Sequence, residues 1–237
     1  MNTILFDLDG TLLTMDTDRF MELYLEALTK AFKPHMNTAL FQARLWEGTK
    51  MMLKNNGETM SNEKVFYETF FNGMEGQKEL MIKVFEDFYQ LGFNQARAAT
   101  EQNEHMVKSI VRLKAKGYRL AVATNPLFPL QAVERRIDWA GLSTDDFELI
   151  TSFETMHACK PNPLFYHQVL NLLNIEPEEA LMVGNDARED LAAAELGIST
   201  YLVTDCLLKD TQQTIVPDHR GTSLDFLHFV EQLPSLL

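Results

Sequence analysis

The chain has 237 residues and a formal net charge of −13 at pH 7. Hydrophobic residues make up 46% of it and charged residues 23%, a balance that supplies a buried core and differs from that of disordered or fibrous proteins. The excess of acidic residues also excludes the broad basic surface with which proteins bind nucleic acids or anionic membranes. We therefore expect a soluble globular protein with neither of these partners.

Nothing near the start of the chain predicts export. Residues 1–6 lead directly to Asp7 without a basic region or a long apolar run, so we expect neither a signal peptide nor a membrane span. The two cysteines, Cys159 and Cys206, are too few for a disulfide framework, which is typical of a reducing compartment. These features predict a cytoplasmic protein and leave its oligomeric state open.

Short apolar runs predict the strands of a single sheet, and they lie at residues 4–8, 120–123, 147–150, 181–183 and 201–203. Each run is separated from the next by a segment with helical spacing of apolar residues. This alternation is typical of the α/β class, in which βαβ units build a parallel sheet. After the last run we expect mostly loop over residues 204–220, and then a final helix with Ser223 as its N-cap.

Glycines and prolines mark the expected ends of the helices between these strands. Gly117, Gly141 and Gly197 each follow a helical stretch, where a glycine relieves the strain of a left-handed backbone. Pro129 and Pro163 stand where helices are expected to begin. The helix boundaries therefore agree with the strand assignment.

About a hundred residues separate the first two predicted strands, far more than the roughly dozen that a crossover between parallel strands requires. Apolar residues recur at helical spacing through this stretch, which predicts helices at residues 18–32, 38–54, 62–72 and 77–91. A further helix at 96–116 would return the chain to the sheet. We therefore expect a helical cap domain at residues 16–95, inserted in a core domain made of residues 1–15 and 96–237.

Two aspartates follow the first predicted strand. The sequence Asp7-Leu8-Asp9-Gly10-Thr11 places their carboxylates two residues apart, and Gly10 lets the chain turn sharply after them. A solvated acidic turn is the ordinary interpretation of an isolated Asp-x-Asp. The complete pattern after an apolar strand instead indicates a site at the end of that strand.

Two further patterns place polar side chains in the loops of the core. Thr124 and Asn125 end the second predicted strand, where such residues usually form a turn. Lys160 lies in Cys159-Lys160-Pro161-Asn162-Pro163, whose prolines fix the approach of the loop and leave the lysine just before a helix. An ammonium held in this way is suited to phosphate oxygens.

An acidic pattern follows the fourth predicted strand, Met182-Val183-Gly184-Asn185-Asp186, with Asp190 four residues later. Carboxylate oxygens are the ligands that Mg²⁺ prefers, although Asp186 could also cap the next helix. Because a carboxylate carries charge and an amide does not, we expect Asp186 to be the direct metal ligand. Asp190 is then an outer group or one that orders the loop, and the role of Asn185 stays open.

These four patterns, in this order, resemble the four motifs of the haloacid dehalogenase superfamily. The likeness covers the core at both ends of the chain, whereas the cap matches only in position and helical character. It departs from the family at Gly184-Asn185-Asp186, since the commoner fourth motif is Gly-Asp. The resemblance implies a Rossmann-like, doubly wound sheet with strand order 5-4-1-2-3 and a cap rooted between the first and second motifs.

The resemblance also implies a magnesium-dependent phosphohydrolase. In such an enzyme Asp7 is the nucleophile that forms an aspartyl-phosphate, and Asp9 is the general acid and base. Mg²⁺ is bound by Asp7, the backbone carbonyl of Asp9 and Asp186. The phosphate of a small phosphorylated metabolite is held by Thr124, Asn125 and Lys160.

Alternative functions share parts of this pattern. A phosphomutase has the same core and returns the phosphoryl group to another hydroxyl, but the cap shows no motif for that transfer. A true dehalogenase of the superfamily lacks the second aspartate of the first motif, so Asp9 argues against it. A phospho-accepting signalling receiver has similar site residues, yet it is much shorter and has no helical insertion. The substrate stays open, because no motif in the cap identifies a leaving group.

Overall fold

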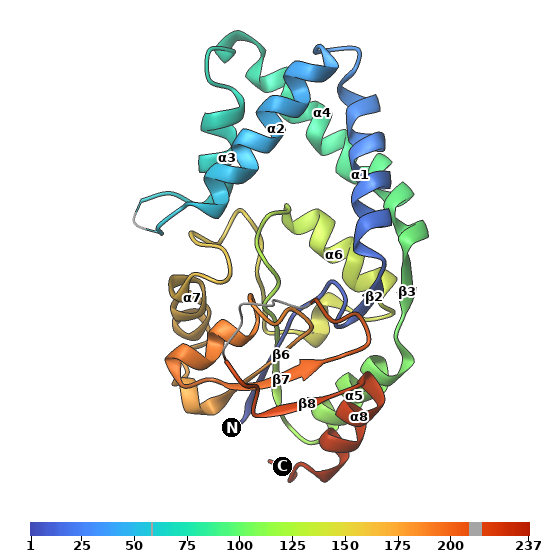
Figure 1. Ribbon diagram of the computed structural model, residues 1–237, viewed down its shortest axis with the longest axis vertical. Helices are drawn as coiled ribbons and strands as arrows, with labels where there is room; N and C mark the ends of the chain where they lie inside the picture. The colour runs from blue at the N-terminus through green and yellow to red at the C-terminus, as the bar shows by residue number, and fades with distance from the viewer. Residues whose placement is uncertain (58, 209–214) are drawn as a thin grey trace.

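The computed structural model describes residues 1–57, 59–208 and 215–237. In this part of the chain, six strands form a parallel sheet in the order β5-β4-β1-β6-β7-β8. A group of helices stands apart from the sheet, on the side opposite the two chain ends (Figure 1). The predicted fold class is therefore confirmed as α/β, with a parallel sheet and a smaller helical cap.

The sheet contains the predicted strands in the predicted order, 5-4-1-2-3, and one strand more. Its members are β1 (Thr3–Phe6), β4 (Arg119–Val122), β5 (Leu149–Ile150), β6 (Ala180–Gly184), β7 (Ser199–Val203) and β8 (His219–Gly221). The start of β8 falls within the stretch predicted to be mostly loop, of which residues 209–214 lie outside the described residues. β8 is a polar edge strand whose side chains are largely exposed, so no apolar run marks it.

Alternate side chains of β1 pack on opposite faces of the sheet. Ile4 and Phe6 share a core with Phe226 of α8 (Ser223–Gln232), and the rings of Phe6 and Phe226 meet edge to face at 5.8 Å. Leu5 instead packs in a second core with Phe165 of α7 (Pro163–Leu173). Because both faces are buried, β1 has apolar residues at its last three positions, Ile4 to Phe6.

Short helices complete the layers around the sheet. Besides α7 and α8 they are α5 (Glu104–Ala115), α6 (Leu130–Trp139), and the 3₁₀ helices η3 (Thr144–Asp146), η4 (Pro177–Glu179) and η5 (Leu191–Leu196). The helix-ending glycines have the expected positive φ, +83° at Gly117, +75° at Gly141 and +90° at Gly197.

Two helix starts differ from the prediction by one residue. Pro163 is the first residue of α7 as expected, whereas Pro129 is the N-cap of α6. The N-cap of α8 is Thr222 rather than Ser223. Thr222 and Asp225 form a capping box, in which each side chain accepts a hydrogen bond from the other residue's backbone N–H.

The cap consists of α1 (Thr17–Phe32), α2 (Thr38–Leu53), α3 (Asn62–Phe70) and α4 (Lys78–Gln90), with the 3₁₀ helices η1 (Glu75–Gln77) and η2 (Gly92–Ala99). Aromatic rings fill its centre: Phe32 lies 4.5 Å from Phe41 and 4.5 Å from Phe85 between ring centroids. None of the helices in the described ranges combines the length and apolar character needed to cross a bilayer.

The predicted helix over residues 96–116 is wrong in its first half. The chain forms η2, then strand β3 (Thr100–Gln102), and enters α5 only at Glu104. β3 pairs antiparallel with β2 (Leu13–Met15), so a pairing between distant residues overrides the helical spacing. Asn103 caps α5 by accepting hydrogen bonds from the N–H groups of His105 and Met106. This residue is a local signal for the true helix start.

The β2–β3 ribbon joins the sheet to the cap (Figure 1). One strand leads into α1 and the other leads back to α5, so both connections pass through the same two-stranded element. We propose that the boundary between the core (1–15 and 96–237) and the cap (16–95) lies at this ribbon.

The packing of α2 against α3 makes a stability prediction. A Cβ atom added to Gly48 of α2 would lie 2.7 Å from Cδ2 of the buried Phe66 ring. Gly48→Ala gains about 1 kcal/mol of helix propensity, but moving the ring costs about 1–3 kcal/mol. We expect a net loss of about 1 kcal/mol in the free energy of unfolding, measured by denaturant unfolding.

Gly76→Ala is the matched control, because no described atom lies within 4 Å of a Cβ at that glycine. It should leave stability unchanged or slightly higher. An equal loss in both variants would contradict the packing explanation. In the double variant Gly48→Ala/Phe66→Leu, the added methyl group should lower the free energy of unfolding by less than it does beside the intact ring.

Candidate active site

The carboxyl ends of β1, β4 and β6 meet around a pocket of about 240 Å³. Strand order reverses at β1, which is where open α/β sheets bind ligands. A larger hollow of about 870 Å³ lies in the cap between α2 and α3, but none of the motif residues lines it. The pocket at the sheet is lined by Asp7, Asp9, Met15, Thr17, Phe20, Met21, Thr124, Asn125, Leu127, Phe128, Asn185, Asp186, Glu189, Asp190 and Leu208.

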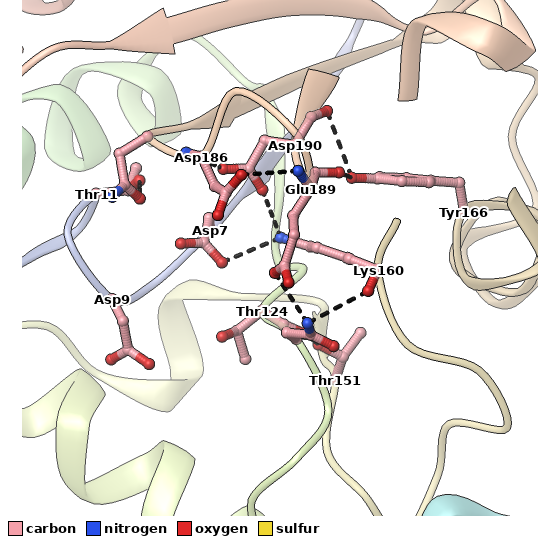
Figure 2. Close-up of polar contacts among 12 residues, drawn as sticks. Asp7, Asp9, Thr11, Thr124, Thr151, Lys160, Tyr166, Asp186, Glu189 and Asp190 are labelled. Atoms are coloured by element: carbon pink, nitrogen blue, oxygen red, sulfur yellow. Dashed lines mark hydrogen bonds and ion pairs between the residues drawn. The ribbon is translucent and has the colours of Figure 1, made fainter. Parts of the chain in front are cut away.

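A buried ammonium lies between two carboxylates that line this pocket (Figure 2). Lys160 Nζ donates to Asp7 Oδ1 at 3.0 Å and to Asp190 Oδ1 at 2.7 Å. Burial lowers the pKa of Lys160, but the two carboxylates raise it well above its ordinary range. Burial raises the pKa of Asp7, and Lys160 opposes that rise. The three groups form a compact charged cluster that links the end of β1 to the loop before α7 and to the loop after β6.

Asp190 also orders the loop that follows β6. Its Oδ2 accepts a hydrogen bond from the backbone N–H of Asp186 at 2.8 Å, so both carboxylate oxygens are engaged. Burial raises the pKa of Asp190 to about 6, with Lys160 as the main opposing influence. A Cβ atom at Gly184 would lie 2.1 Å from Asp190 Oδ2, so only glycine leaves room for this carboxylate.

Asn185 and Asp186 point to different partners. The Asn185 amide accepts a hydrogen bond from the Thr11 hydroxyl at 2.9 Å and donates one to the Cys206 carbonyl at 2.8 Å. Asp186 Oδ1 accepts from the backbone N–H groups of Arg188 and Glu189, at 2.7 and 2.9 Å. Asn185 therefore braces the turn after β1, while Asp186 shapes the loop and lines the pocket.

The partner of Asp9 is a residue that the sequence analysis missed. Arg136 of α6 is fully buried, and its Nη1 forms an ion pair with Asp9 Oδ2. Its Nε donates to the Ala132 carbonyl at 3.1 Å, and its guanidinium carbon lies 4.5 Å from the ring centroid of Phe128. Arg135 and Arg136 are adjacent in an amphipathic helix, where both would be expected to be solvated. No sequence signal therefore indicates that Arg136 is the buried one.

The Asp9 side chain points away from Asp7 and Lys160 (Figure 2). Burial raises the pKa of Asp9, and Arg136 opposes this rise without cancelling it. Asp9 Oδ1 and Arg136 Nη2 are both buried without a hydrogen-bond partner among the described residues. The ion pair therefore leaves hydrogen-bonding capacity unused on each side.

Thr124 and Asn125 lie at the end of β4, as the sequence predicts. The Thr151 hydroxyl donates to the Thr124 carbonyl at 2.7 Å, which fixes this end of the strand. Asn125 Nδ2 donates to Glu189 Oε2 at 2.8 Å, while Asn125 Oδ1 is buried without a partner in the described structure. Glu189 was also missed, and burial raises its pKa to about 7.

The carboxylate oxygens in the pocket are suitable ligands for a magnesium ion. Within residues 1–57, 59–208 and 215–237, no group of three or more His, Cys, Asp or Glu side chains is gathered as a ready cation site. Mg²⁺ commonly uses only one or two carboxylates and completes its shell with water and substrate oxygens. Asp7 and Asp186 line the same pocket, and each has one oxygen that accepts no hydrogen bond from the described residues.

Comparisons with known proteins agree with this geometry. Residues 1–197 match the family described as haloacid dehalogenase-like hydrolase. Pyrophosphatase PpaX from Bacillus cereus is 26% identical over 204 residues, which cover 86% of this chain and 83% of that protein. The corresponding protein from Bacillus thuringiensis is 24% identical over the same length.

Solved structures share the fold at lower identity. A HAD phosphatase from Thermococcus onnurineus matches with a TM-score of 0.60 and 19% identity, over 100% of both chains. A predicted phosphoglycolate phosphatase from Haemophilus somnus gives 0.58 and 20%, over 97% of both chains. An L-2-haloacid dehalogenase from Xanthobacter autotrophicus gives 0.58 and 17%, over 98% of this chain and 99% of that one. The chain therefore belongs to the haloacid dehalogenase-like hydrolase family.

Proposed function

We propose that this hydrolase is a Mg²⁺-dependent phosphatase that acts on small phosphate monoesters. The observation that carries the proposal is the contact of the buried Lys160 with Asp7, which lines a pocket together with Thr124 and Asp186. It pairs a carboxylate nucleophile with a cation for phosphate oxygens. Relatives named as a pyrophosphatase, a HAD phosphatase and a predicted phosphoglycolate phosphatase support phosphate as the group transferred.

In the proposed reaction, a carboxylate oxygen of Asp7 attacks phosphorus while the bond to the ester oxygen breaks. The product is an aspartyl-phosphate, which water then hydrolyses in a second displacement. Lys160, Thr124 and Asn125 hold the phosphate oxygens and stabilise the charge that gathers on them. The unpaired Asn125 Oδ1 is suited to accept a hydrogen bond from the attacking water or a protonated phosphate oxygen.

Asp9 is the proposed general acid and base. It protonates the departing alkoxide in the first displacement and removes a proton from water in the second. Burial raises the pKa of Asp9 despite Arg136, which favours the protonated form needed at the first step. To reach the ester oxygen, the Asp9 carboxyl must leave Arg136. The presence of Asp9 also argues against the dehalogenase chemistry of some structural neighbours.

Asp7, Asp186 and the backbone carbonyl of Asp9 would hold the Mg²⁺. When bound, the ion would lessen the repulsion between the Asp7 carboxylate and the anionic phosphate.

The cytoplasmic location inferred from the sparse cysteines stays a prediction, as does the absence of nucleic-acid partners.

The division of work between the two aspartates is testable with two leaving groups. Asp9→Asn keeps an oxygen for Arg136 but donates no carboxylic proton, so alkyl phosphate turnover should fall roughly 10²–10⁴-fold. Dinitrophenol departs without a proton, so the same variant should release one equivalent of it. The variant should then stall as a phosphorylated protein, detected by intact mass.

Asp7→Asn is the control, and it should give neither a burst nor a phosphorylated protein with either ester. Loss of the burst in a folded Asp9→Asn protein would show that Asp9 does more than exchange a proton. Full phosphatase activity in Asp7→Asn would reject the proposed nucleophile.

The metal role of Asp186 gives the next prediction. Asp186→Ala removes a carboxylate ligand, so the Mg²⁺ concentration for half-maximal activity should rise at least roughly tenfold. Asn185→Ala should change it less and should instead lower stability, because this amide bridges Thr11 and Cys206. Calorimetric titration with Mg²⁺ checks binding independently of turnover. A weaker Mg²⁺ affinity in Asn185→Ala than in Asp186→Ala would reverse the assignment.

Glu189, which holds Asn125, should make stability depend on pH. Its pKa rises from an ordinary 4.5 to about 7 on folding, so the folded state keeps its proton to higher pH than the unfolded state. The free energy of unfolding should therefore fall between about pH 4.5 and 7. Glu189→Gln removes this dependence and should be more stable than wild type at pH 8 by about 2 kcal/mol. Denaturant unfolding at pH 4.5 and 8 in metal-free buffer tests this, and an equal difference at both pH values would contradict it.

A further inference from the structure

The pocket above Asp7 has a polar floor and an apolar wall. The wall comes from four parts of the chain: β2, the first turns of α1, the loop between β4 and α6, and the segment after β7. Its apolar members are Met15, Phe20, Met21, Leu127, Phe128 and Leu208. A substrate whose phosphate lies against Asp7 would place its leaving group beside these side chains.

The aromatic part of the wall is held in shape by ring contacts. Phe128 lies 6.4 Å from Phe20 and 5.3 Å from Tyr24 between ring centroids, in edge-to-face geometry. Phe20 makes a similar contact with Phe93 at 6.0 Å and is only 2% exposed. Side chains packed in this way do not move aside cheaply, so the wall presents a preformed apolar surface.

Among the described residues, the wall offers no cation to a second anionic group. None of the described residues that line the pocket is Lys, Arg or His, whereas five are Asp or Glu. The nearby cations are already paired, Lys160 with Asp7 and Asp190, and Arg136 with Asp9. A carboxylate or second phosphate on the leaving group would lose water against apolar side chains and face carboxylates of the same sign.

The volume of the pocket suits a small leaving group. An apolar cavity of roughly 150 Å³ takes one benzene ring, and this pocket has about 240 Å³ for the phosphate and the leaving group together. A nucleoside or a disaccharide would exceed it.

We propose that this enzyme selects phosphate monoesters whose leaving group is uncharged, largely apolar and about the size of one ring. The inference rests on the proposed phosphatase function and adds the class of substrate. The proposed substrate class differs from the substrates that the relatives' names describe, because pyrophosphate and phosphoglycolate each carry a second anionic group.

Two matched esters test the charge of the leaving group at nearly constant size. With Mg²⁺ and the full chain, we would compare kcat/KM for 3-carbamoylphenyl phosphate and 3-carboxyphenyl phosphate, with phenyl phosphate as reference. The uncharged amide should be preferred roughly 100-fold, because a like charge in the pocket costs several kcal/mol. Pyrophosphate and 2-phosphoglycolate should be similarly poor substrates.

Met21 allows the reciprocal test, because its side chain lines the wall and takes no part in the proposed chemistry. Met21→Arg adds a cation and should reduce the preference for the amide at least tenfold, by raising kcat/KM for the carboxylate. Met21→Gln, similar in length but uncharged, should leave the preference unchanged.

Each outcome decides between the proposals. Equal or faster turnover of the carboxylate ester by the wild type would overturn the substrate class and leave the phosphatase function intact. An unchanged preference in a folded Met21→Arg protein would show that the charge of the wall does not set the selectivity. No turnover of any ester would overturn both the function and the inference that rests on it.

Discussion

The buried ammonium of Lys160 is the interaction on which the rest of the site depends. Asp7 and Asp190 lie on opposite sides of it, at 3.0 and 2.7 Å. Two carboxylates in a space closed to water repel each other strongly, and a cation between them removes most of that penalty. Loss of the lysine would leave two buried carboxylates unpaired. The charge of Lys160 therefore holds three segments together: the end of β1, the loop before α7 and the loop after β6.

That charge balance explains sequence features that appear unrelated. Asp190 reaches Lys160 only because residue 184 is glycine, since a Cβ there would lie 2.1 Å from the carboxylate. Once Asp190 is placed, its second oxygen holds the backbone of Asp186 and turns the loop toward the pocket. Asn185, the departure from the commoner motif, then bonds to Thr11 at the edge of the pocket. The extra residue thus braces the first motif against the fourth.

The fold was predictable wherever burial leaves a continuous or periodic apolar pattern. β1, β4, β6 and β7 are buried and were found, whereas β8 is an exposed edge and the β2–β3 ribbon depends on pairing between residues nearly ninety apart. The site residues were predictable where a motif combined a strand end with a charged side chain. Arg136 and Glu189 were not, because a charged residue in a helix or loop is ordinarily solvated. Only tertiary packing buries Arg136 and brings Glu189 to Asn125. Sequence alone therefore identified residues that the fold gathers at one sheet edge, but not the groups that restrain them.

The overall charge of the chain, −13, makes binding of an anionic ester a problem that the pocket must solve locally. In the proposed reaction Lys160 is the cation beneath the phosphate, and it is already shared between two carboxylates. Further attraction for the phosphate would come from the proposed Mg²⁺ and from hydrogen-bond donors at the strand ends, all on the floor of the pocket. Nothing of this kind is found along the wall formed by β2, α1, the loop before α6 and the segment after β7, where the described lining residues are mostly apolar. Affinity for the rest of the substrate must then come from removing apolar surface from water, which rewards an uncharged group and penalises a second anion.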